Sequence, residues 1–159
     1  MNALTLPGDP YAAWDSGDFR TAFRLFAAQA QAGDHDVELN LGYFYDVGLG
    51  TRKNRVKAMY WYRRAYRRGS GAAASNIATI YRDEGRHAME FAWYKRAAIL
   101  QDGDAEVEIA KLYLSGSGVR KDRRKGMAAL RRALASRFIT PDGREAAAQL
   151  LAACKTGST

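Results

Sequence analysis

Apolar side chains recur along the chain with the spacing of an amphipathic helix. The order aliphatic, small, any residue, apolar, Tyr occurs three times and ends at Tyr45, Tyr81 and Tyr113. Its apolar positions stand at i, i+3 and i+4, which lie on one face of an α-helix. The small residue on that face lets a second helix come close. The pattern therefore predicts one kind of helix that is used several times.

A turn and a second helix are predicted to follow each of these tyrosines. Two of the turns carry Gly-x-Gly, at positions 48–50 and 116–118. Because glycine adopts positive φ angles without strain, we interpret them as tight helix connections rather than phosphate-binding loops. At Ala58 and Gly126 we expect room for a ring of the preceding helix. The predicted inner faces of the two following helices comprise Ala58, Trp61, Tyr62 and Ala65, and then Gly126, Ala129, Leu130 and Ala133.

The composition favours helices throughout. Ala, Leu and aromatic residues are frequent, Ile and Val are scarce, and proline occurs only at positions 7, 10 and 141. We predict an all-α single domain of about nine helices. The predicted hairpins cover residues 9–33, 37–69, 72–103 and 105–137, and a capping helix covers residues 141–155. Such a cap covers the apolar face that a last repeat would expose.

Three motifs together resemble the Sel-1-like repeat, a relative of the tetratricopeptide repeat. They are Leu-Gly-x-x-Tyr, the following Gly-x-Gly, and Ala-x-x-Trp-Tyr-Arg-Arg-Ala with a closing Gly69. Residues 37–69 match closely and 105–137 match well, whereas 72–103 has a turn predicted to be six residues shorter and Glu90 in place of Ala. The resemblance implies an α-solenoid of stacked antiparallel helix hairpins that binds another protein.

Three features of the sequence bear on the cellular compartment of the protein. Residues 1–7 lack a basic start followed by a long apolar run, so we expect no signal peptide. No apolar run reaches the length of a bilayer span, so we expect no membrane partner. Cys154 is the only cysteine and cannot form an internal disulfide, which favours a cytoplasmic protein. We interpret Cys154 as a small buried apolar residue.

The sequence shows no arrangement typical of catalysis or cofactor binding. His35 and His87 are far apart in predicted turns, where we expect them to face solvent, and a metal site needs three or four clustered ligands. Asp102 and Asp104 flank a predicted helix start, where acids cap free N–H groups. We predict a protein that is not an enzyme and has no metal, cofactor or small-molecule substrate.

The resemblance implies a contact surface on the first helix of each hairpin, which lines the concave side of tetratricopeptide-like stacks. Its outward positions mix apolar and polar groups, as a groove for a peptide or helix does. Asn40 and Asn76 recur at one repeat position, where an amide binds either a ligand backbone or the neighbouring hairpin. The candidate groove residues are Leu39, Asn40, Tyr43, Asp46, Ser75, Asn76, Thr79, Arg82, Val107, Lys111 and Leu114.

A second candidate surface is a basic edge formed by the turns. Equivalent turns of stacked repeats lie side by side, so their basic residues are predicted to form a stripe. A net charge of +8 would attract an acidic protein or a nucleic acid, although charge runs also simply keep helical surfaces soluble. The edge comprises Arg52, Lys53, Arg55, Arg86, Arg120, Lys121, Arg123 and Arg124.

These observations lead to one functional hypothesis and two alternatives. We predict a bacterial, cytoplasmic protein-interaction module that acts as an adaptor, a regulator or a toxin-neutralising immunity protein. The alternatives are a nucleic-acid-binding repeat protein that uses the basic edge, and a non-catalytic subunit of an enzyme complex. Which of the two surfaces does the binding stays open at this point.

Overall fold

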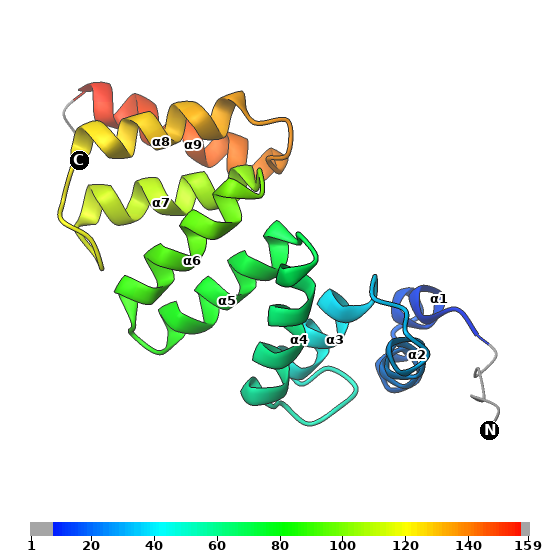
Figure 1. Cartoon of the computed structure of the whole chain (residues 1–159). Helices are drawn as coiled ribbons and strands as arrows, with labels where there is room; N and C mark the ends of the chain where they lie inside the picture. The colour runs from blue at the N-terminus through cyan, green and yellow to red at the C-terminus, as the bar shows by residue number, and fades with distance from the viewer. Residues whose placement is uncertain (1–7, 157–159) are drawn as a thin grey trace. The chain divides into compact units, whose positions relative to one another are not determined.

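A computed structural model gives the structure of residues 8–156 of the 159-residue chain. These residues form nine α-helices and no strand, so the all-α prediction is confirmed (Figure 1). The expectation about a signal peptide concerns residues 1–7, which lie outside the described residues. The helices are α1 (Pro10–Asp15), α2 (Phe19–Gln31), α3 (Glu38–Val47), α4 (Arg55–Arg67), α5 (Gly71–Asp83), α6 (His87–Ile99), α7 (Gly103–Ser115), α8 (Arg123–Ala135) and α9 (Pro141–Thr156).

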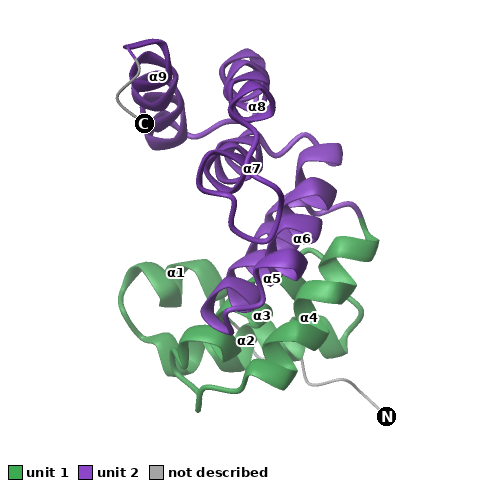
Figure 2. Cartoon of the chain, turned by 90° about the vertical axis from the view of Figure 1, so that its left-hand side faces the viewer, with its two compact units in different colours: residues 1–68 green, residues 69–159 purple. Residues whose placement is uncertain are grey.

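The helices divide between two compact units, residues 1–68 and residues 69–159 (Figure 2). In the first unit α1 pairs with α2, and α3 pairs with α4. In the second unit α5 pairs with α6, α7 pairs with α8, and α9 packs on α8 and α7. Successive helix pairs joined by short turns are the building block of helical-repeat proteins. That the chain acts as a single domain stays a prediction.

The second unit repeats the first at a fixed offset of 68 residues. Thus α2 and α6 begin at Phe19 and His87, and both helices have 13 residues. In the same way α4 and α8 begin at Arg55 and Arg123, and both again have 13 residues. The chain therefore repeats not only by single hairpins but also at a longer period, whose repeating unit is a pair of hairpins.

Equivalent rings make equivalent contacts in the two units. Phe23 on α2 meets Tyr45 on α3 edge to face, with 5.3 Å between ring centroids. Phe91 on α6 meets Tyr113 on α7 in the same way at 5.2 Å. Edge-to-face pairs stabilise packing beyond the apolar area that they bury. Within each unit, Tyr45 or Tyr113 of the sequence pattern thus ties the later hairpin to the second helix of the hairpin before it.

The second glycine of each Gly-x-Gly turn allows a close backbone approach between hairpins. Gly50 has φ +62° and lies against the backbone of Phe19, at the start of α2. Gly118 has φ +67° and lies against the backbone of His87, at the start of α6. A Cβ atom at either glycine would clash with that backbone. These glycines therefore serve contact with the preceding hairpin as well as the turn itself.

Helices α3 and α4 also approach each other closely in the first unit. Gly42 lies directly against the ring of Tyr62, so that a Cβ atom at position 42 would overlap the ring. The ring thus packs on the first helix of the hairpin, and Tyr62 is fully buried. The expectation that Gly126 leaves room for a ring is wrong, because its neighbours are the side chain of Leu114 and the carbonyl of Ala110.

The turn of the middle hairpin is shorter than its counterparts, but by four residues rather than the six that the sequence analysis gives. It spans residues 84–86, compared with 48–54 and 116–122 in the hairpins on either side. Helices α3, α5 and α7 all end two residues after the repeated tyrosine, so the whole difference lies in the turn. A three-residue turn lacks the Gly-x-Gly segment that contacts the preceding hairpin.

Replacing Asp122 with asparagine should reduce the loss of stability that the protein shows in acid. The Asp122 carboxylate accepts the backbone N–H of Lys125 at the start of α8, and this bond, with the nearby Lys125 charge, lowers its pKa below the ordinary value of 3.8. A lowered pKa stabilises the fold above pH 3.8, and the contribution disappears as pH falls through the folded-state value. Asn54 makes the same cap without charge in the first unit, so Asp122→Asn keeps the cap at neutral pH.

Urea unfolding at pH 7 and at pH 3 measures this effect. At pH 7 the free energy of unfolding of the variant should stay close to the wild-type value. The decrease in this free energy from pH 7 to pH 3 should be smaller for the variant than for wild type. An unchanged acid dependence would contradict this role for the carboxylate.

Candidate functional site

The predicted groove residues divide between the two units, and each set is described within its own unit. Tyr43, Arg82 and Lys111 are exposed. Val107 is only 2% exposed, so its side chain is part of the core of the second unit and cannot contact a partner. The remaining groove residues are half-buried, namely Leu39, Asn40, Asp46, Ser75, Asn76, Thr79 and Leu114.

Two groove residues on α3 contact aromatic side chains of α1. Asn40 donates a hydrogen bond from Nδ2 to the hydroxyl of Tyr11 at 3.1 Å, so this amide binds the neighbouring hairpin. Tyr43 stacks on Trp14, with 5.7 Å between ring centroids and 22° between the ring planes. Tyr11 remains 52% exposed and Tyr43 remains 41% exposed. We call Tyr11, Trp14 and Tyr43 the aromatic patch.

In the second unit the groove residues of α5 and α7 are tied into a polar network. Arg82 and Lys111 both pair with Glu108, at 3.7 Å and 2.6 Å. Thr79 shares a hydrogen bond of 3.3 Å with the hydroxyl of Tyr94, whose pKa is raised because the phenol is buried. The two basic groove residues therefore share one carboxylate, so both are engaged within the unit and one positive charge is left in excess.

The basic edge is exposed, but part of it is already engaged. Arg86 pairs with Glu84 at 3.4 Å, and its guanidinium lies 4.7 Å from the ring centroid of Tyr81. Arg123 donates a hydrogen bond to the backbone carbonyl of Cys154, a buried residue of α9. Arg55 is half-buried, and the solvent-exposed remainder comprises Arg52, Lys53, Arg120, Lys121 and Arg124.

An ion pair that the sequence analysis missed occurs at the same place in both units. Glu38 on α3 pairs with Arg64 on α4 at 2.9 Å. Glu106 on α7 pairs with Arg132 on α8 at 2.7 Å. Each pair joins the beginning of one helix to the end of the next. The sequence signal was a glutamate followed by an arginine 26 residues later, found twice at the offset of 68 residues.

The two carboxylates have different surroundings. Glu38 is fully buried, and its Oε1 accepts a hydrogen bond of 2.9 Å from Nδ1 of His35 in addition to the contact with Arg64. Its Oε2 lies 3.5 Å from Nε of Arg68 and accepts no hydrogen bond from the described residues. One carboxylate in the first unit is thus covered by two guanidinium groups and an imidazole.

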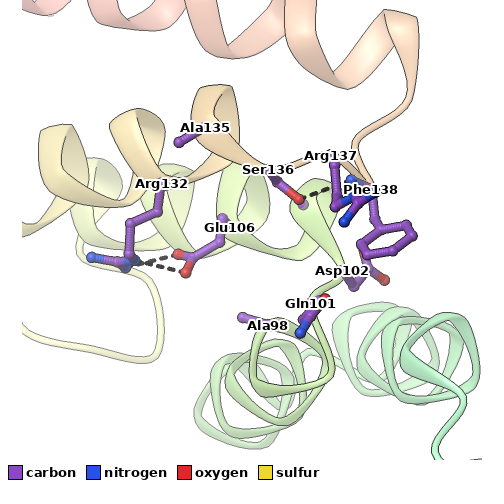
Figure 3. A pocket seen from close by; sticks show the side chains of 10 residues that line it. Ala98, Gln101, Asp102, Glu106, Arg132, Ala135, Ser136, Arg137 and Phe138 are labelled. Carbon is purple, nitrogen blue, oxygen red and sulfur yellow. Dashed lines mark hydrogen bonds and ion pairs between the residues drawn. The ribbon is translucent and has the colours of Figure 1, made fainter.

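Glu106 in the second unit lies instead beside an open cavity of about 290 Å³ (Figure 3). Its side chain is 15% exposed, and its two oxygens accept bonds of 2.7 Å from Nε and Nη2 of Arg132. At the offset of 68 residues, His35 corresponds to Gly103 and Arg68 corresponds to Ser136. Both of these small residues line the cavity.

The histidines do not simply face solvent as the sequence analysis expects. His35 bonds to Glu38, and His87 bonds through Nδ1 to Oε2 of the buried Glu90 at 2.8 Å. A search of residues 8–156 for three clustered metal-binding side chains finds none. Within the same range, none of the helices has the length and apolarity needed to cross a bilayer.

Comparison with known proteins identifies related chains. The Sel1 repeat family matches residues 35–70, 91–102 and 103–135, together about half of the chain. The ERAD-associated E3 ubiquitin-protein ligase component HRD3B of Arabidopsis thaliana is 31% identical over 103 residues. An uncharacterized protein of Neisseria meningitidis serogroup B is 29% identical over 111 residues. These matches cover 64% and 67% of this chain but only 17% and 23% of the two relatives.

Two solved structures share the fold at 26% sequence identity. A Sel1 repeat protein from Oxalobacter formigenes superposes with a TM-score of 0.68, covering 92% of this chain and 64% of that one. A protective antigen present in uropathogenic Escherichia coli strains, which displays an SLR fold, gives a TM-score of 0.63, covering 79% and 30%. Sel1 repeats are helical modules for protein–protein interaction and are generally non-catalytic. From the matched repeats and the shared fold, we conclude that this chain belongs to the Sel1 repeat family.

Proposed function

We propose that the chain is a cytoplasmic adaptor, regulator or immunity protein that binds a protein partner through the aromatic patch of its first unit. The observation that carries this proposal is a pair of exposed rings that are held in place. Tyr43 stacks on Trp14, and Tyr11 meets the ring of Phe26 edge to face and accepts the hydrogen bond from Asn40. Rings held by stacking lose little conformational freedom on binding, and tyrosine and tryptophan are enriched at protein interfaces. The charged residues of the groove around Glu108 are engaged in ion pairs and fit the rim of an interface better than its centre.

The basic edge is proposed to guide the partner towards the chain. Arg120, Lys121 and Arg124 are exposed and form no ion pair with any side chain among residues 8–156. Together with the net charge of +8, such a surface raises the rate of encounter with an acidic protein. We therefore expect the partner to be acidic and the association rate to fall with salt.

A tyrosine-to-alanine substitution in the patch tests the proposal. Tyr43→Ala should weaken the purified complex tenfold or more, on the order of the loss at an interface hot spot. Tyr60→Ala is the matched control, because Tyr60 on α4 is 52% exposed and lies outside the patch. Partners are recovered from the native host, purified and titrated against all three proteins by calorimetry. Equal affinities for wild type and Tyr43→Ala, or no partner that binds saturably, would contradict the proposal.

Nucleic acid remains the second candidate because the exposed basic residues of the turn at 116–122 are not paired. Binding of this kind releases counterions, so its affinity must fall steeply with salt. Titrating a fluorescent oligonucleotide against wild type and an Arg120→Gln/Lys121→Gln variant separates the two candidates. If the chain does not bind the oligonucleotide at low salt, the nucleic-acid alternative is excluded. HRD3B is named as a component of a ubiquitin-protein ligase. If this chain is instead a non-catalytic subunit of an enzyme complex, the recovered partner would itself be an enzyme.

A further inference from the structure

The cavity beside Glu106 corresponds to a position that is filled in the first unit. There, the side chains of His35 and Arg68 cover the carboxylate of Glu38. In the second unit the corresponding residues, Gly103 and Ser136, have no side chain long enough to reach Glu106. The duplicated hairpins thus provide two versions of one site, and only the second is open.

The Glu106 carboxylate keeps acceptor capacity on its open side. A carboxylate offers about four lone-pair positions, and the two hydrogen bonds from Arg132 use two of them. Among residues 8–156, Arg132 is the residue that pairs with Glu106. Figure 3 shows Arg132 on one side of the carboxylate, with Ser136, Arg137 and Phe138 on the other side of the cavity.

The other walls of the cavity carry charges of both signs. The guanidinium of Arg132 is already bound by Glu106 through two bonds. Arg137 lies over the ring of Phe138, 5.6 Å from its centroid. Asp102, which also lines the cavity, adds a second carboxylate that accepts hydrogen bonds from Ser75 and from the backbone of Ala105.

Size restricts the ligand further. At about 290 Å³ the cavity lies at the lower limit of pockets that hold a whole small molecule. It is large enough for one long side chain. Phe138 is 59% exposed at its rim, so its ring can cover the apolar stem or the flat face of such a side chain.

We propose that this cavity binds the arginine side chain of a protein partner. The incoming guanidinium would occupy, at Glu106, the place that Arg68 takes at Glu38 in the first unit. Arginine fits better than lysine because its planar group donates to a carboxylate and stacks on an aromatic ring at the same time. The proposal rests on the proposed function, since the arginine belongs to a protein partner.

An NMR titration of the full chain with N-acetyl-arginine methylamide tests the site directly. Wild type should bind saturably, with the largest amide shifts at Gly103, Glu106 and Ser136. The citrulline derivative has nearly the same shape without the charge and should bind at least tenfold more weakly. An arginine-containing peptide in place of the capped amino acid should bind at the same amides.

Three variants make the result specific. Glu106→Gln removes the charge that faces the cavity and should weaken binding by about tenfold or more. Ser136→Arg copies the first unit and should abolish binding by filling the cavity. Glu145→Gln, on α9 and outside the cavity, should bind as wild type does. Thermal unfolding of each variant establishes that it is folded.

Equal shifts with the arginine and citrulline derivatives would overturn the proposal, as would undiminished binding to Glu106→Gln or Ser136→Arg. The outcome is separate from that of the proposed function. If the cavity binds the arginine probes but no protein partner exists, the proposed function fails, and with it the source of the arginine, while the cavity stands as a binding site for an arginine side chain. If a partner binds the aromatic patch while the cavity ignores the arginine probes, only the cavity proposal fails.

Discussion

Replacing Gly42 with alanine is expected to destabilise the first unit by about 3 kcal/mol. A methyl group at this position would overlap the ring of Tyr62, which is fully buried and has no free space into which to move. Relief therefore requires α3 and α4 to separate or Tyr62 to leave its rotamer, and both weaken the hairpin. Urea unfolding followed by circular dichroism measures the loss.

The second unit indicates how the clash can be removed. Its residues at the positions of Gly42 and Tyr62 are Ala110 and Leu130, both fully buried. Tyr62→Leu alone should cost stability through lost packing, but in the double variant the two changes should offset each other by 1 kcal/mol or more, roughly as expected for residues in contact. Strictly additive losses in this double-mutant cycle would mean that Gly42 and Tyr62 do not act as a pair.

The features that depend on periodicity were predictable from the sequence. Ala129, Leu130 and Ala133 face the core as expected, each with 0% of its surface exposed, because apolar spacing alone decides which face of a helix is buried. The capping role of Asp102 was equally local, since its carboxylate accepts the N–H of Ala105 three residues away. The buried Cys154 also follows from its place on the apolar side of the last helix.

The features that depend on contacts between helices were not predictable in the same way. Val107 was placed on an outer surface because its repeat position is outward in similar proteins, yet its side chain is buried in the second unit. The pairs of Glu38 with Arg64 and Glu106 with Arg132 link residues on different helices, and neither partner has a distinctive local pattern. Only the offset of 68 residues, which reveals the same pair twice, carries that information. An alignment of single hairpins does not contain that information.

Replacing Glu38 with glutamine is expected to lower the free energy of unfolding by about 2–3 kcal/mol. The loss of a fully buried charge leaves Arg64 and Arg68 facing each other without the anion between them, and the amide cannot serve both guanidinium groups and His35. The effect stays below that of a wholly buried pair because Arg64 is 27% and Arg68 is 50% exposed, so that water compensates part of their charge.

The duplicated site provides the control for this prediction. Glu106→Gln changes the same chemical group at the same repeat position, but Glu106 neutralises one arginine, and that arginine is 56% exposed. We therefore expect it to cost about 1 kcal/mol or less. Chemical unfolding of both variants at pH 7, in low and high salt, compares them directly, and salt should reduce the smaller loss more than the larger one. If the two substitutions lower the free energy of unfolding equally, His35 and Arg68 do not strengthen the ion pair of Glu38 with Arg64. The closed site at Glu38 and the open site at Glu106 would then not differ in energy.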